Sequence, residues 1–254
     1  MPTSGTQRVY CSGVTALLTL LGLAVTGCIE VDQTLTLEPD GSGSLAVSYA
    51  VSEQTMRRIE GIHAASERIA SDRKLSLERN PWMMLVFDPE ALNQRLKQYA
   101  NKGIYLDRFN ASTANAQQNV SFKVSFDSIA EVASADFFAS YGFSLIAGER
   151  NRMTLITGPW VSNRVTRITD LESPEALTLL RPLIGNFRFA LTIRPPGRVL
   201  DTNAHRSTPV NAQWNYDASE TPGAFFDFQE TPIRLVFDGS RSKIPPIRQT
   251  RPAD

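Results

Sequence analysis

The residue types that could carry out hydrolysis lie together in residues 200–208, which read LDTNAHRST. Asp201, His205 and Ser207 are the three residue types of a catalytic triad. A triad is defined by geometry, however, and so short a loop rarely folds three such side chains into a proton relay. No G-x-S-x-G nucleophile elbow occurs in the chain. We therefore interpret the stretch as a polar turn, with Asn203 in its tight part.

Few residues in the sequence are placed to bind a metal ion. The DGSGS stretch at 40–44 has the composition of the start of a calcium loop, but Val51 occupies the twelfth position, where an EF-hand needs glutamate. We expect a tight turn there and no phosphate cradle, because a strand follows it whereas a P-loop runs into a helix. His63 has no second histidine three or four residues away, so we expect it to pack at the boundary of a helix. Neither a metal site nor a cofactor is expected.

Two aromatic clusters offer a different chemistry. They read Asp136-Phe137-Phe138 and Phe225-Phe226-Asp227-Phe228. Core packing is the default interpretation of such clusters. A ligand groove lined by the same rings is the alternative, because apolar pockets are built from these residue types.

A hydrophobic segment near the amino terminus, VTALLTLLGLAVTGC at residues 14–28, bears on the cellular location of the protein. Arg8 is the only charge before Glu30. As a helix, the apolar part from Val14 to Val25 would cover roughly 18 Å, well short of the ~30 Å hydrocarbon core of a bilayer. A basic residue, a short apolar stretch and small residues at its end describe a secretory signal peptide.

The end of this run, Val25-Thr26-Gly27-Cys28, resembles a bacterial lipobox. The resemblance implies cleavage between Gly27 and Cys28, an S-diacylglycerol group on the Cys28 thiol and an N-acyl group such as palmitate on the new amino terminus. Each buried methylene contributes about 0.8 kcal/mol, so several chains would hold the protein to a membrane without spanning it. An ordinary signal peptide and an uncleaved anchor are the alternatives.

Charge and cysteine content narrow the class of protein further. The chain has 26 Lys and Arg against 26 Asp and Glu, which gives no reason to expect a nucleic-acid partner. Of its two cysteines, Cys11 lies in the signal peptide and Cys28 would be acylated. The mature domain is therefore expected to form no disulfide, although disulfides persist outside the cytosol, and to depend on core packing.

Alternating apolar and polar residues predict most of the secondary structure. Residues 29–51 predict a β-hairpin around the PDGSG turn at 39–43. Further strands are predicted at 82–87, 104–109, 120–126, 187–193, 210–216 and 233–237, with a second hairpin at 143–158. Helices are predicted at about 52–72, 89–102, 128–141 and 174–185, and an exposed loop at 110–119.

These elements predict an α+β fold, mainly antiparallel sheet with about nine strands and about four helices. We expect a signal peptide over residues 1–27, one domain over 28–239 and a flexible tail over 240–254, because the tail has few large apolar residues. The basic residues of the tail could alternatively touch anionic lipid headgroups.

Two stretches resemble the LppM-domain family of bacterial lipoproteins. CIEVDQTLTLEPDGSGSLAVSYAVS at 28–52 is similar to the start of that domain, where the acylated cysteine leads straight into a hairpin with a Gly-rich turn. FRFALTIRPPGRVLDTNAHRSTPVNAQWNYD at 187–217 is similar to its later strand–turn–strand block, here with Pro196-Gly197, Asn203 and Trp214. Members are cell-envelope lipoproteins for which lipid or glycolipid binding has been proposed. Some carry a carboxy-terminal membrane span, where this chain has SRSKIPPIRQTRPAD.

The resulting hypothesis is a membrane-anchored, non-enzymatic cell-envelope lipoprotein whose domain binds a lipid, a glycolipid or an envelope partner. One alternative is an exported hydrolase with scattered catalytic residues. Another is a structural or assembly subunit that pairs an exposed sheet edge with a partner. Ile29 rather than aspartate follows Cys28, which favours the outer membrane in a host with two membranes.

Overall fold

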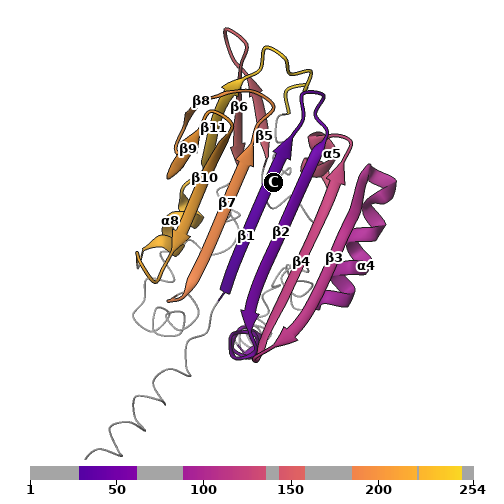
Figure 1. Cartoon of the computed structure of the whole chain (residues 1–254), viewed down its shortest axis with the longest axis vertical. Helices are drawn as coiled ribbons and strands as arrows, with labels where there is room; N and C mark the ends of the chain where they lie inside the picture. Colours follow the sequence, from indigo (N-terminus) through magenta and orange to yellow (C-terminus); the bar gives the residue numbers. More distant parts are fainter. Residues whose placement is uncertain (1–28, 62–87, 136–142, 158–184, 222, 248–254) are drawn as a thin grey trace, which may run out of the picture.

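The computed structural model describes residues 29–61, 88–135, 143–157, 185–221 and 223–247 of the chain (Figure 1). Within these residues, eleven strands form two sheets. The first has the order β3-β4-β2-β1-β7-β10-β9 and the second the order β5-β6-β11-β8. All neighbours are antiparallel except β1 and β7, which are parallel. The predicted α+β class is confirmed.

The strands of the first sheet are β1 (Ile29–Leu37), β2 (Gly43–Ser52), β3 (Ile104–Ala114), β4 (Gln117–Phe126), β7 (Phe187–Arg194), β9 (Arg206–Thr208) and β10 (Asn211–Asp217). Those of the second are β5 (Ser144–Ala147), β6 (Arg152–Thr157), β8 (Val199–Thr202) and β11 (Ile233–Asp238). The helices are α4 (Pro89–Gln98), the 3-10 helix η1 (Tyr99–Lys102), α5 (Ile129–Ser134) and α8 (Ala224–Glu230). Residues 53–61 are also helical.

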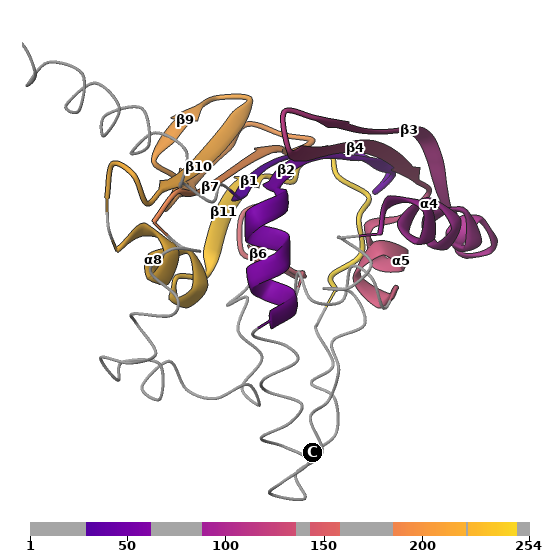
Figure 2. The ribbon, with the colours of Figure 1, turned by 90° about the horizontal axis from the view of Figure 1, so that it is seen from below.

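The seven-stranded sheet forms an arch with one covered and one open face. Figure 2 shows the second sheet, α4, α5 and α8 on the inner side of this arch. The inner side chains of β2 and of the second half of β1 are buried, as the alternation predicts; Leu35 and Leu45 are each 1% exposed. The outer face carries the polar positions of the same strands and is open to solvent.

The first hairpin follows the prediction closely. β1 and β2 pair in register from Ile29 opposite Val51 to Leu37 opposite Gly43. Gly41 adopts a φ of 94° in the turn, a conformation that a side chain disfavours. At Gly43 an added Cβ would lie 2.1 Å from the Thr36 carbonyl oxygen, so this position admits glycine alone.

The helix predicted to follow Asp88 also matches. The Asp88 carboxylate accepts a hydrogen bond from the Ala91 amide at 3.0 Å and caps α4, whose first residue is Pro89. Gly103 ends the following 3-10 turn with a φ of 70°. The helix predicted to begin at Ser128 is shorter than expected, because the backbone is extended again at Ala135.

The structure differs from the prediction in two respects. Residues 110–119 are not a loop: β3 and β4 continue to a two-residue turn at Asn115 and Ala116, both with positive φ. The strands β8 and β9 and the helix α8 were not predicted. The strand predicted at 82–87 and the helix predicted at 174–185 lie outside the described residues, except for residue 185.

The predicted flexible tail also differs, because residues 240–247 pack against the domain. Ile244 is 5% exposed and lies next to Gly41, where an added Cβ would be 3.5 Å from its Cγ1 atom. Ile247 exchanges two backbone hydrogen bonds with Leu145, each 2.8 Å long, and so covers the edge of β5. Two well-placed isoleucines are enough to hold a segment that is otherwise polar. Residues 248–254 lie outside the described residues.

A transmembrane helix is not found in the described part of the chain, where no helix is both long and apolar enough to cross a bilayer.

Candidate functional site

The three residues of the possible triad are held by different partners. The Asp201 carboxylate pairs with the Arg234 guanidinium at 2.8 Å, and this hydrogen bond lowers the pKa of Asp201. The His205 Nδ1 atom accepts a hydrogen bond from the Asn215 amide at 2.9 Å. Ser207 lies in β9, in register with Ala212.

This arrangement differs from a catalytic triad in the hydrogen bond made by the Nδ1 atom of the histidine. In a triad, Nδ1 of histidine carries the proton and donates it to the aspartate. In this protein Nδ1 of His205 is an acceptor, so it cannot donate to Asp201. The His205 ring instead packs edge-on against Tyr216, with 5.1 Å between ring centroids. His63 lies outside the described residues.

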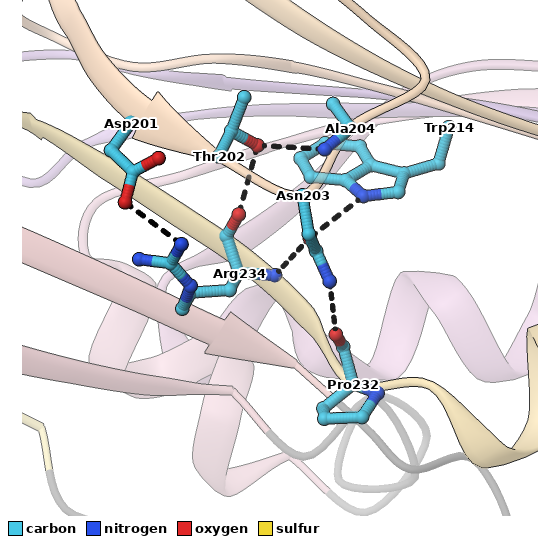
Figure 3. Close-up of polar contacts among 7 residues, drawn as sticks. All are labelled: Asp201, Thr202, Asn203, Ala204, Trp214, Pro232 and Arg234. Carbon is cyan, nitrogen blue, oxygen red and sulfur yellow. Dashed lines mark hydrogen bonds and ion pairs between the residues drawn. The ribbon is translucent and has the colours of Figure 1, made fainter.

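The same stretch does have a structural function, which centres on Asn203 (Figure 3). Its Oδ1 accepts hydrogen bonds from Trp214 Nε1 at 3.1 Å and from the Arg234 amide at 2.9 Å. Its Nδ2 donates to the Pro232 carbonyl at 2.8 Å. Trp214 belongs to the seven-stranded sheet and Arg234 to the four-stranded sheet. We call these four residues the Asn203 cluster, and they join the two sheets.

The DGSGS stretch forms the expected turn. Asp40 Oδ1 accepts from the Ser42 amide at 3.0 Å and from its hydroxyl at 2.7 Å. These hydrogen bonds lower the pKa of Asp40. Across the residues that the structure describes, no group of three His, Cys, Asp or Glu side chains is placed to hold a metal ion.

The second aromatic cluster packs against the aromatic residues of β7. Phe228 of α8 lies 4.2 Å from Phe189 and 5.4 Å from Phe187, between ring centroids. Phe225 meets Phe187 edge-on at 5.1 Å. Such offset and edge-on pairs fill the space beneath β7 and β10. Residues 136–138 lie outside the described residues.

A hollow lies on the outer face of the seven-stranded sheet. Its volume is about 550 Å³, within the range of small-molecule sites. We call it the outer trough. Its polar and small lining residues are Asp32, Thr34, Ala46, Ser48, Asp107, Arg108, Ser121 and Lys123. None of its lining residues is a histidine or a cysteine.

A second hollow of about 250 Å³ continues the trough along the strands. It shares Asp32, Ser48 and Ser121 with the first and extends to Glu30 at the start of β1. The small side chains of β2 form the floor where the two hollows meet. The β3 strand supplies Asp107 and Arg108 at a bulge, where the register with β4 shifts between Leu106 and Arg108.

Two cations lie next to each other in this trough. The register places Arg108 directly opposite Lys123 on the neighbouring strand. Like charges directly opposite each other destabilise a sheet. Among the residues that the structure describes, neither side chain has a carboxylate partner within ion-pair distance. A guanidinium and an ammonium in this arrangement can bind a phosphate or carboxylate group.

Sequence reasoning did not identify the outer trough. Its residues occupy the outward positions of four strands and look like ordinary solvent-facing residues. The only available signal was the row of small outward residues Ala46, Ser48 and Ala50. Cys28, the one site residue that the sequence proposed, lies outside the described residues, directly before Ile29.

Comparison with known proteins gives a distant likeness to solved structures. No protein-family model matches the sequence, and no curated protein matches it. Among solved structures, the NMR structure of the folded domain of Mycobacterium tuberculosis LppM is similar over 92% of this chain and 95% of that one. The sequence identity is 11% and the TM-score is 0.38. Membership of the LppM-domain family therefore stays a prediction.

Proposed function

We propose that this chain is a cell-envelope lipoprotein, exported and anchored to a membrane through acylated Cys28, whose α+β domain binds a ligand and catalyses no reaction. The ligand is a lipid, a glycolipid or an envelope protein that presents an anionic group. In a host with two membranes, the anchor favours the outer membrane. The Arg108–Lys123 pair in the outer trough is the observation on which the binding function depends.

The anchor is supported by the position of Cys28 relative to the fold. The first strand begins at Ile29, the next residue. Cleavage before Cys28 would remove residues 1–27 and leave the first strand of the domain whole. Processing at this position is therefore compatible with the fold.

The binding function is supported by two adjacent cations in an open trough, whose lining also includes the carboxylates of Asp32 and Asp107. Arg108 and Lys123 face each other across β3 and β4, and bringing a phosphate or carboxylate between them would relieve their repulsion. The hydroxyls of Ser48 and Ser121 lie in the same trough and can hydrogen-bond to a polar headgroup or sugar.

The anchor is tested by labelling cells of the native host with radioactive palmitate. We expect label on the wild-type chain and none on the Cys28→Ser variant, which should also leave the membrane fraction or stay unprocessed. Absence of label from the wild-type chain would refute the anchor.

The binding function is tested by native mass spectrometry of the purified protein, looking for co-purified ligand. We expect a bound mass in the wild type and its loss in the Arg108→Ala/Lys123→Ala variant. The matched control is Lys97→Ala/Arg241→Ala, which removes two exposed cations outside the trough. Equal retention of the bound mass by both variants would exclude the trough as the binding site.

A further inference from the structure

The proposed anchor is attached at the centre of the seven-stranded sheet. The strand β1 is the fourth of seven in the order of the sheet. Its first residue, Ile29, pairs with Val51 of β2 on one side and with Phe187 of β7 on the other. Both neighbours therefore restrain the direction of the chain from the residue that follows Cys28. No flexible spacer separates the acylated residue from the sheet.

The register identifies the other residues at this end of the sheet. Val51 is followed by Ser52, which pairs with Gln117, so the Asn115–Ala116 turn of the β3–β4 hairpin lies at the same end. On the other side, β10 ends at Asp217 opposite Arg188, and Glu220 follows. We call this end the base. In Figure 1 it is the lower end of the seven-stranded sheet.

The opposite end is formed by three turns that contact each other. The Lys243 amide donates to the Pro39 carbonyl at 2.7 Å, and the Gly239 amide donates to the Asn151 carbonyl at 2.6 Å. We call this the distal end. Nine residues of β1 separate it from the base, which corresponds to about 30 Å at the rise of a β-strand.

From this geometry we propose that the base faces the lipid headgroups, with the strands standing upright on the membrane and the distal end about 30 Å away from it. This inference rests on the proposed anchor at Cys28. The Cα atom of Cys28 lies about 3.8 Å from that of Ile29, and only a short thioether-linked glycerol and the amino group join it to the acyl chains, so the base must lie close to the bilayer. Laying the outer face flat on the membrane would instead desolvate its charged side chains, including Glu30 and Asp32.

Charge at the base does not provide the attachment. Arg188 contacts the Asp217 carboxylate at 3.1 Å and the Glu30 carboxylate at 3.7 Å. These three side chains carry one positive and two negative charges. These three side chains together do not attract anionic headgroups, and we attribute the orientation to the covalent tether.

The test measures the distance of three labelled positions from the membrane. The acylated mature chain has no free thiol, since Cys11 is removed and Cys28 is blocked, so single cysteines can carry a fluorophore. Ala114→Cys and Glu220→Cys place it at the base, on either side of β1, and Glu149→Cys places it in the β5–β6 turn at the distal end. All three positions are exposed. Each acylated variant is reconstituted into phosphatidylcholine vesicles containing a phospholipid with a nitroxide on its headgroup.

We expect strong quenching at positions 114 and 220, and fluorescence at position 149 equal to that in vesicles without nitroxide. Quenching that is equal at the three positions, or strongest at 149, overturns the orientation. The intact mass of each vesicle-bound variant separates the two proposals. An acylated chain with the wrong quenching pattern refutes the orientation alone, and a vesicle-bound chain without acyl mass refutes the anchor and the orientation together. Equal melting temperatures of the three variants show that the cysteines leave the fold intact.

Discussion

Replacing Asn203 by alanine should loosen the contact between the two sheets. The side chain of Asn203 makes three hydrogen bonds, to Trp214 of β10, to the Arg234 amide of β11 and to the Pro232 carbonyl. Alanine removes all three. It leaves the indole N–H of Trp214, a residue with 0% exposure, without its acceptor.

The expected loss of stability follows from these contacts. A hydrogen bond contributes about 0.5–1.5 kcal/mol net, and a buried donor left unsatisfied costs about 1–3 kcal/mol. Asn203 is itself exposed, so water can replace part of what is lost. We therefore expect Asn203→Ala to lower the free energy of unfolding by about 2 kcal/mol.

The assay is urea denaturation followed by far-UV circular dichroism, on the unlipidated chain that begins at Ile29. Trp214→Phe and the double variant complete a double-mutant cycle, and we expect a coupling energy of about 1 kcal/mol between the two positions. The matched control is Asn110→Ala, because the Asn110 side chain makes no hydrogen bond within the part of the chain that the structure describes. The control should change stability by less than about 0.5 kcal/mol.

Two results would refute this reasoning. A loss for Asn203→Ala no larger than that for Asn110→Ala would mean that the cluster does not hold the sheets together. Additive effects of Asn203→Ala and Trp214→Phe, with no coupling energy, would mean that the indole hydrogen bond contributes nothing to stability.

Three further predictions concern stability. Gly43→Ala should destabilise the domain by more than about 2 kcal/mol, because its Cβ would overlap a backbone oxygen. The control Gly61→Ala, with open space around it, should be neutral or stabilising by up to about 1 kcal/mol. Equal melting temperatures of the two variants would contradict this prediction. Ile244→Ala should cost about 2–4 kcal/mol because the side chain is buried, and unchanged stability after truncation at residue 239 would contradict it. Pairing with Arg234 lowers the pKa of Asp201 in the folded state. The contribution of this ion pair to stability is therefore present above the unfolded pKa of about 3.9 and is lost as the pH falls below it. The free energy of unfolding of Asp201→Asn should depend less steeply on pH below about 4 than that of the wild type.

The sequence alone was sufficient to predict those elements whose structure is set by residues near each other along the chain. The alternation at 29–37 and 45–51 predicted β1 and β2, because a sheet with one buried face needs apolar residues at every second position. Asp88, Pro89 and Gly103 likewise marked the start and end of a helical segment through capping and backbone conformation.

Sequence reasoning failed where a segment does not need the alternation or the helical period that reveals an element. Residues 110–114 belong to β3, an edge strand exposed on both faces at this end, so no apolar alternation is required there. Residues 225–228 had no helical period to detect, because their rings pack against one another and against β7. The tail at 240–247 looked too polar to pack, and only the folded structure brings Ile244 next to the Gly41 turn.

The candidate site shows the same division. The sequence by itself determined the cysteine that could be acylated and the residue types that could form a triad. Only the tertiary structure decided that Asp201 pairs with Arg234, that Nδ1 of His205 is an acceptor, and that Arg108 lies opposite Lys123. The physical reason is that partners in a sheet are chosen by strand order and register, which bring together residues far apart in the chain. The parallel pairing of β1 with β7 places the proposed anchor at the middle of the sheet in the same way.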